Sequence, residues 1–183
     1  MVWTVLAVLV TLLYPLALWL GQSWAEPRSL ALLLVVAAAL RLPAVKLSAG
    51  ARWSVAGALL LVACAMWSNA MLPLKLYPVM VNAGFLAAFA WSLSTPVSMV
   101  ERFARLREPE LPAEGVAYTR RVTQAWCVFF AANGAIAAGT ALLASDRAWW
   151  LYNGVIAYVL MGLMFGGELL VRRRVQAGIA RNA

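Results

Sequence analysis

The chain contains no histidine among its 183 residues. Histidine is the commonest metal ligand in proteins and the side chain whose ordinary pKa best suits a general base near neutral pH. Its absence excludes haem with histidine ligation, carboxylate–histidine di-iron sites, histidine-containing zinc sites and histidine general bases. Any catalysis would have to use carboxylates, thiols or hydroxyls.

Cysteines and acidic residues are also scarce. The two cysteines, Cys64 and Cys127, lie in apolar runs, where a thiol behaves as a small hydrophobic side chain, and they form no disulfide framework. Only seven residues are acidic, and the sequence has no carboxylate pair within an apolar run, no phosphate-binding glycine loop and no serine or cysteine beside a base. We therefore predict that the protein is not an enzyme and holds neither a metal nor a cofactor.

What the chain has in abundance is apolar residues. They make up 64% of the sequence, and the mean hydropathy is +0.83. A soluble domain of this length cannot bury so much apolar surface, so the composition indicates a polytopic membrane protein. The net charge of +8 comes from Lys and Arg in short clusters between apolar runs, which is typical of membrane topology and speaks against nucleic acid as a partner.

We expect an all-α fold, with residues 1–183 forming a single transmembrane domain of six helices. The expected spans are Val2–Leu20, Ser29–Val45, Trp53–Leu72, Leu76–Ser94, Val122–Ala144 and Trp149–Val171. The first is interpreted as a retained helix rather than a signal peptide, because no Lys or Arg precedes its long apolar run. The second run is uninterrupted for only twelve residues before Arg41. Five spans plus a re-entrant segment therefore form the alternative.

The distribution of basic residues predicts the orientation. With six spans, twelve of the fifteen Lys and Arg residues fall on the side of the two termini, and three fall on the opposite side. Cytoplasmic loops of membrane proteins carry the excess of Lys and Arg. The N- and C-termini are therefore predicted to be cytoplasmic, in a multi-pass protein of a bacterial inner membrane.

One long polar stretch, Pro96–Asn133, interrupts the apolar sequence. At its start Met99, Val100, Phe103 and Leu106 recur at helical spacing, which predicts an amphipathic helix lying on the inner leaflet. A turn-rich loop with Pro109 follows, so residues 97–121 are expected to be cytoplasmic. The stretch is interpreted as a surface for a protein partner or for membrane lipids, with an ordinary solvated loop as the alternative. The candidate surface residues are Arg102, Arg105, Arg107, Arg120 and Arg121.

Three asparagines lie inside expected spans, namely Asn82, Asn133 and Asn153. A carboxamide in hydrocarbon needs a hydrogen-bond partner, so these side chains should face the interior of the helix bundle. One hypothesis is structural: they join the last three helices. The other is a ligand groove for a lipid-like molecule, open toward the outer leaflet. Its rim would be formed by Lys75, Tyr77, Trp150 and Tyr152.

Two further features fall in the last expected span. Glu168 stands four residues before Arg172, the spacing that favours an ion pair on a helix. A structural pair is the first interpretation, and proton handling or orientation of a lipid headgroup are the alternatives. Gly162 and Gly166 follow the small-xxx-small pattern, which indicates helix packing within the bundle or the seam of a homodimer.

The last part of the chain carries a pattern of aromatic and basic landmarks. It reads LP, YTRR and WCVFFAANG, followed by AWW, NG, G, FGGE and RRR, between Leu111 and Arg174. This pattern resembles an uncharacterised family of small bacterial inner-membrane proteins encoded among aryl polyene or other fatty-acid-like biosynthesis genes. More distantly, it resembles the intracellular septation protein family, usually drawn with five spans. The similarity covers about Lys75–Arg174, and it implies no catalytic site.

These observations predict a non-enzymatic scaffold or accessory subunit in biogenesis of the cell envelope or of a lipid-like, polyene-type product. Its expected partners are membrane lipids and other inner-membrane or cytoplasmic biosynthetic proteins. The alternative is a transporter or flippase-like carrier that moves a lipid-like substrate through the asparagine-lined groove. A continuous polar path from Glu168 to Asn133 and Asn82 would favour the carrier, and a sealed interior would favour the scaffold.

Overall fold

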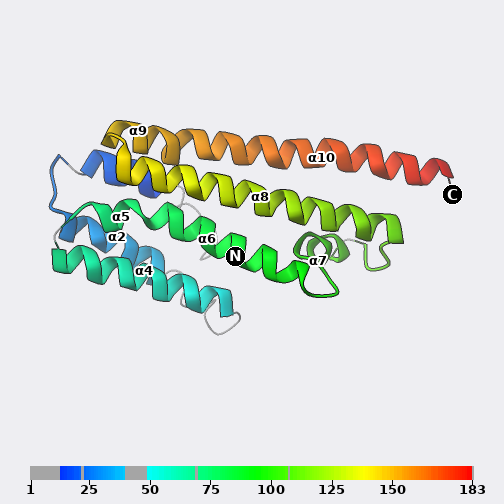
Figure 1. Cartoon of the computed structure of the whole chain (residues 1–183), viewed down its shortest axis with the longest axis horizontal. Helices are drawn as coiled ribbons and strands as arrows, with labels where there is room; N and C mark the ends of the chain where they lie inside the picture. Colours follow the sequence, from blue (N-terminus) through cyan, green and yellow to red (C-terminus); the bar gives the residue numbers. More distant parts are fainter. Residues whose placement is uncertain (1–12, 22, 40–48, 69, 107, 183) are drawn as a thin grey trace.

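The chain folds into helices laid side by side, as a computed structural model of the chain shows (Figure 1). The structure describes residues 13–21, 23–39, 49–68, 70–106 and 108–182, and these residues contain helices and no strand. The all-α prediction is confirmed. Residues 2–12 of the expected span Val2–Leu20 and residues 40–45 of Ser29–Val45 lie outside the described residues, so the structure does not test either as a complete span.

The helices follow one another along the bundle. Residues 13–21 are helical. The labelled helices are α2 (Pro27–Ala39), α4 (Ala49–Ser68), α5 (Leu72–Lys75), α6 (Tyr77–Leu93), α7 (Met99–Arg105), α8 (Ala113–Leu143), α9 (Asp146–Leu151) and α10 (Ala157–Asn182), with a π-helix, η1 (Tyr152–Ile156), between the last two. In order of contact, α2 packs on α4, α4 on α6, and α6 on α8, while α10 runs alongside α8 (Figure 1).

Three of the described helical stretches are long and apolar enough to cross a membrane. They are Leu72–Leu93, Ala113–Leu143 and Asp146–Arg172. An α-helix rises 1.5 Å per residue and a bilayer core is about 30 Å thick, so roughly twenty apolar residues are needed. The apolar part of α4, Ala56–Ser68, is shorter than that, and α2 has only 13 residues. The chain therefore has the character of a helical membrane protein.

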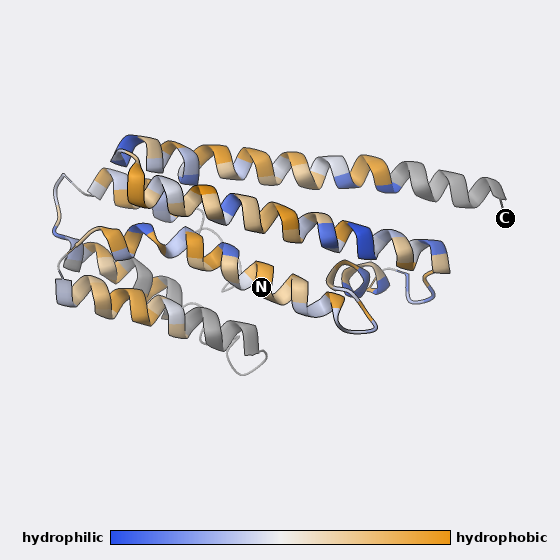
Figure 2. Ribbon diagram, in the orientation of Figure 1, coloured by the Kyte–Doolittle hydropathy of each residue, from blue (hydrophilic) through white to orange (hydrophobic). Residues whose placement is uncertain are grey.

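Helix α10 ends at Asn182, beyond the expected Val171, and the start of α8 also differs from expectation. Helix α8 was expected to start near Val122, but it begins at Ala113 and is 31 residues long. Pro112 precedes its first turn and Glu114 lies within that turn, where a negative charge complements the positive end of the helix dipole. Residues 113–121 combine Glu114, Arg120 and Arg121 with apolar residues such as Val116, and Figure 2 shows α8 extending past the end of α6. The polar loop is therefore shorter than expected.

Helix α7 lies crosswise to the long helices. Figure 1 views it nearly end-on while α6 and α8 run across the picture. It packs against α8 and α6. We call this end of the bundle the α7 end, and the opposite end, where α9 lies, the α9 end. The amphipathic helix expected in this stretch is present, with bounds Met99–Arg105.

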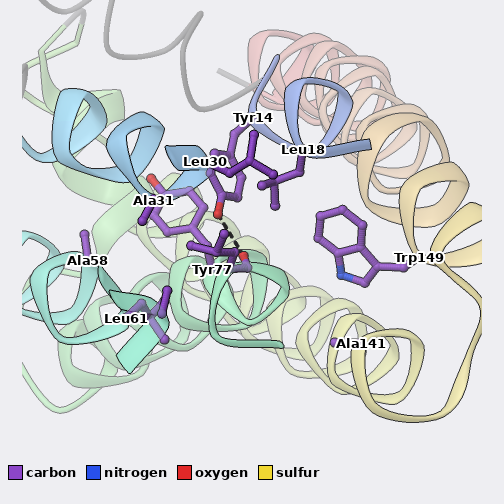
Figure 3. Close-up of a cluster of buried hydrophobic side chains, with 11 residues drawn as sticks. Tyr14, Leu18, Leu30, Ala31, Ala58, Leu61, Tyr77, Ala141 and Trp149 are labelled. Atoms are coloured by element: carbon purple, nitrogen blue, oxygen red, sulfur yellow. Dashed lines mark hydrogen bonds between the residues drawn. The ribbon is translucent and has the colours of Figure 1, made fainter. Parts of the chain in front are cut away.

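The main hydrophobic core lies at the α9 end. It gathers the first described helix, α2, α4, α5, α6, α8 and α9 around Tyr14 and Tyr77, whose rings meet edge to face at 4.8 Å (Figure 3). The Tyr14 hydroxyl donates a hydrogen bond to the backbone oxygen of Leu74 at 2.9 Å. Since Leu74 precedes the start of α6 by three residues, this bond ties the N-terminal helix to the entrance of the bundle.

Candidate functional site

A chain of hydrogen bonds runs through the interior between α6, α8 and η1. The Tyr152 hydroxyl donates to Asn133 Oδ1 at 2.8 Å, and Asn133 Nδ2 donates to Asn82 Oδ1 at 3.0 Å. Asn82 Nδ2 in turn donates to the backbone oxygen of Pro78 at 2.9 Å. All three side chains are buried. Asn82 and Asn133 therefore face the bundle interior, as predicted, and they bond to each other.

Close approach of α6 and α8 makes this network possible. A Cβ added at Gly134 would lie 3.1 Å from the Cβ of Asn82, tighter than ordinary van der Waals contact. The glycine next to Asn133 therefore lets the two carboxamides meet. Small residues serve this purpose generally in membrane helices, where backbone contact drives association.

Asn153 does not belong to the same network. Its Nδ2 donates to Thr140 Oγ1 at 3.2 Å and to the backbone oxygen of Trp149 at 2.9 Å. It is buried and joins η1 to α8 nearer the α9 end. The three asparagines expected to form one polar surface thus form two separate sets of hydrogen bonds.

A layer of aromatic rings separates the asparagine network from the α7 end. Phe130 stands one turn before Asn133 on α8, and its ring centroid lies 5.1 Å from that of Phe85 and 5.2 Å from that of Phe89. Trp126, one turn further along, lies 5.5 Å from Phe130. On the other side, the ring of Phe165 on α10 lies 4.6 Å from that of Trp126. We call these five residues, from α6, α8 and α10, the aromatic layer.

The rim residues of the expected groove are engaged within the protein. Lys75 forms an ion pair with Asp146, and its backbone oxygen accepts a hydrogen bond from Trp149 Nε1 at 3.2 Å. Tyr77 is buried in the core. The Trp150 ring stacks on Trp19 with centroids 4.5 Å apart. Lys75, Tyr77 and Trp150 therefore all pack against other parts of the protein.

An open cleft does occur at the α9 end, with a volume of about 290 Å³. It is lined by Trp19, Leu20, Ser23 and Trp24. None of the seven residues expected to form the asparagine-lined groove is among them. This cleft is therefore not the expected groove, which stays a prediction.

Glu168 and Arg172 do not form the expected ion pair. Within the part of the chain that the structure describes, the ion pairs are Lys75–Asp146 and Glu101–Arg105. The side chain of Tyr118 approaches the Glu168 turn instead, and its hydroxyl donates to the Glu168 backbone oxygen at 3.2 Å. Glu168 and Arg172 are both partly exposed, so water can solvate each charge and the spacing alone does not force a pair.

Glu101 is a buried carboxylic acid on α7. Only 2% of the residue is exposed. Its carboxylate accepts hydrogen bonds from Arg105 Nε at 2.9 Å and from the backbone amide of Ser98 at 3.4 Å. It forms an ion pair with Arg105 at 2.8 Å. The signals for this arrangement were the Ser98-x-x-Glu101 spacing of a capping box and the i,i+4 spacing to Arg105.

Hydroxyl groups dock α7 on its neighbours. The backbone amide of Met99 donates to Ser92 Oγ at 2.9 Å, and that of Val100 donates to Thr123 Oγ1 at 3.3 Å. These two amides belong to the first turn of α7, where a helix leaves its N–H groups without partners of its own. Ser92 and Thr123 are fully buried. The docked face of α7 is therefore polar.

The opposite face of α7 is apolar and exposed. Phe103 is 59% exposed and Leu106, directly after the helix, is 80% exposed. Met99 and Val100, expected in the same stripe, are partly buried because their amides turn toward α6 and α8. The exposed apolar stripe on α7 thus consists of two residues instead of the four expected.

The arginines at the α7 end have different surroundings. Arg105 is held by Glu101 and also donates from Nη1 to the Pro109 backbone oxygen at 2.9 Å. Arg102 and Arg120 reach the turn between α6 and α7, and Arg121 is exposed. Arg107 lies outside the described residues. The five predicted surface residues are therefore not equivalent.

The glycines of α10 face open space. A Cβ added at Gly162 or Gly166 would meet nothing within 4 Å, so their small size serves no contact within the described chain. A homodimer seam through them stays a prediction.

Among the described residues, no three His, Cys, Asp or Glu side chains gather in a way that could hold a metal ion.

Buried hydrogen bonds therefore join the helices at two places along the bundle. The asparagine network joins α6, α8 and η1, and the α7 docking contacts join α7 to α6 and α8. Comparison of the chain with models of known protein families, with curated proteins and with solved structures finds no match in any of the three.

Proposed function

We propose that this chain is a non-enzymatic scaffold or accessory subunit of a bacterial inner membrane, with six spans and both termini in the cytoplasm. The described basic residues support this orientation. Arg102, Arg105, Arg120 and Arg121 all lie at the α7 end. At the α9 end, Lys75 is neutralised by Asp146. The α7 end is then the cytoplasmic one.

The observation that carries the proposal is that the buried polar side chains between α6, α8 and η1 bond to one another. A carrier of a lipid-like substrate needs polar groups that the substrate or water can reach along a path through the bundle. Here the polar groups of Asn82, Asn133 and Tyr152 satisfy one another, and the aromatic layer separates them from Glu168 at the α7 end. This arrangement favours a structural role over a transport role.

The loop between α7 and α8 is the segment best placed to meet a partner. Glu108, Pro109 and Glu110 are exposed. Arg105 donates to the Pro109 backbone oxygen, and Leu111 packs against Gly115 in the first turn of α8. The loop is therefore fixed at both ends while its acidic tip faces water. We propose that this tip contacts a biosynthetic protein, and that the product is lipid-like and of the polyene type.

The test changes the exposed tip of the loop and leaves Arg105 and Leu111, which hold its ends, unchanged. Glu108-Pro109-Glu110 is replaced by Ser-Gly-Ser, and the control variant carries Glu108→Asp and Glu110→Asp, which preserve charge and proline. Proteins cross-linked to the chain in intact cells are quantified by mass spectrometry after extraction in mild detergent. We expect the Ser-Gly-Ser variant to lose the specific cross-links and the control to retain them, at equal expression. Retention of every cross-link by both variants would contradict the docking role of the loop.

A second measurement addresses the carrier alternative. The purified chain is reconstituted in vesicles that contain a fluorescent phospholipid, and a membrane-impermeant reductant bleaches the outer leaflet. With a closed interior, bleaching should stop near one half of the signal, as in vesicles without protein. Complete bleaching that Asn133→Leu abolishes would favour the carrier and overturn the scaffold.

A further inference from the structure

Two arginine side chains are fixed on one short turn at the α7 end. Arg102 Nε donates to the Val97 backbone oxygen at 3.3 Å, and Arg102 Nη2 donates to Thr95 Oγ1 at 3.4 Å. Arg120 reaches the same turn from α8, where its Nη2 donates to the Leu93 backbone oxygen. The residues that accept these bonds lie between Leu93 and Val97, so both guanidinium groups are anchored on the same five-residue segment.

The turn itself is compact. The backbone amide of Ser94 donates to the Trp91 oxygen at 3.0 Å, and that of Thr95 donates to the Ser92 oxygen at 3.2 Å. Thr95 Oγ1 lies 2.8 Å from the Ser92 oxygen and 3.0 Å from the Val97 oxygen. This framework gives the two arginines a defined platform rather than a mobile loop.

The turn lies at the depth where lipid phosphates are found. From Leu143 to Thr123, where α7 docks, α8 rises about 30 Å, which equals the thickness of a bilayer core. The turn begins at Leu93, the last residue of α6, and Trp91 in the final turn of α6 is 72% exposed. Tryptophan gathers at the level of the headgroups. The guanidinium groups of Arg102 and Arg120 therefore stand at the boundary between hydrocarbon and headgroups.

Among the residues that the structure describes, no acidic side chain forms an ion pair with Arg102 or Arg120. Glu101, the one acidic residue of α7, points inward and is occupied by Arg105. The other described ion pair lies at the α9 end. A guanidinium has five N–H donors, of which Arg102 uses two in these contacts and Arg120 uses one. Several donors therefore remain for an anion with planar or tetrahedral oxygens.

We propose that Arg102 and Arg120, presented by the Leu93–Val97 turn, bind the phosphate of an anionic phospholipid headgroup. The exposed rings and methyl groups of Phe103 and Leu106 lie next to this site in sequence and contact the acyl chains. Two fixed guanidinium groups favour a headgroup with net negative charge over a zwitterionic one, because the choline cation is repelled. The site needs no partner protein and is independent of the scaffold role.

The test measures lipid binding to the purified full chain in a mild non-ionic detergent by native mass spectrometry. The probes are dioctanoyl phosphatidylglycerol and dioctanoyl phosphatidylcholine, and inorganic phosphate serves as a soluble competitor. We expect Arg102→Gln and Arg120→Gln each to weaken phosphatidylglycerol binding about fivefold, with phosphatidylcholine little changed. Arg121→Gln is the matched control, since it removes the same charge one residue further along α8, where the exposed Arg121 forms none of the described hydrogen bonds to the turn. It should change binding less than twofold.

Three outcomes would overturn the site. Equal loss in Arg120→Gln and Arg121→Gln would show that only overall charge matters. Equal affinity of the wild-type chain for the two lipids would remove the anionic preference. Displacement of the lipid by inorganic phosphate at the same concentration would assign the arginines to a soluble anion. Arg102→Lys and Arg120→Lys, which preserve the charge, should bind with intermediate affinity, which separates loss of the site from misfolding.

Discussion

Replacement of Glu101 by glutamine tests whether the buried carboxylate holds α7 in place. The change keeps the shape of the side chain and removes the charge that pairs with Arg105 at 2.8 Å and 2.9 Å. Loss of a buried charge-assisted pair can cost several kcal/mol, but the Arg105 side chain is 38% exposed and water can solvate it. We therefore expect a cost of about 1–2 kcal/mol.

This cost should appear as local opening of α7. A helix of seven residues is unstable by itself, so its amides are protected only while it is docked. A loss of 1–2 kcal/mol corresponds to an increase of roughly 5- to 30-fold in the opening equilibrium. Hydrogen exchange of a peptide covering residues 98–106, measured by mass spectrometry in lipid nanodiscs, should accelerate by that factor. Exchange in the middle of α8 should not change.

The matched control is Glu108→Gln, which removes an exposed acidic charge two residues after Leu106. It should leave exchange of the same peptide within twofold of the wild type. The reasoning would be refuted if Glu101→Gln left exchange of α7 unchanged. It would also be refuted if both variants accelerated exchange equally, because net charge rather than the buried contact would then be responsible.

Three further predictions concern the membrane interior and the orientation. Asn133→Leu should destabilise the protein by about 1 kcal/mol more than Asn82→Leu in a denaturing-detergent titration. The reason is that Asn133→Leu leaves both Asn82 Oδ1 and the Tyr152 hydroxyl without their hydrogen-bond partner, whereas Asn82→Leu leaves only Asn133 Nδ2 without one. Equal losses of stability in the two variants would contradict this order of hydrogen bonds. Glu168→Gln should change stability by less than about 0.5 kcal/mol in the same titration, since Glu168 forms no ion pair with Arg172. A loss of several kcal/mol would indicate that the two side chains do form an ion pair. A cysteine at Glu110 should be shielded from a membrane-impermeant thiol reagent in cells with a permeabilised outer membrane, whereas one at Arg147 should react; the reverse labelling would invert the topology.

The apolar helices were predictable because each corresponds to one continuous apolar run of the sequence. Leu76–Ser94 was expected and α6 covers Tyr77–Leu93, since a continuous apolar run between polar ends is sufficient to define such a helix. The early start of α8 was missed. Residues 113–121 carry no apolar run, and their helix is supported by α7, which packs on Thr123.

The burial of Asn82, Asn133 and Asn153 followed from the cost of placing a carboxamide in hydrocarbon. Their partners could not be derived in the same way. Which side chains meet depends on the rotation and spacing of helices far apart in sequence, and Asn133 and Asn82 are 51 residues apart. The same limit applied to Arg102 and Arg120, which are both anchored on a turn that belongs to neither of their helices.

The π-helix η1 determines which way α10 faces. Its five residues, Tyr152–Ile156, interrupt the α-helical pattern that starts with α9, and such segments arise when one extra residue is accommodated in a helix. Each residue of an α-helix turns the chain by about 100°. Deletion of one residue here would restore a regular helix and rotate α10 by that angle relative to Trp149. Phe165 would then leave Trp126, and a different side of α10, about a quarter turn away, would face α8. The orientation of a 26-residue helix thus depends on a single inserted residue.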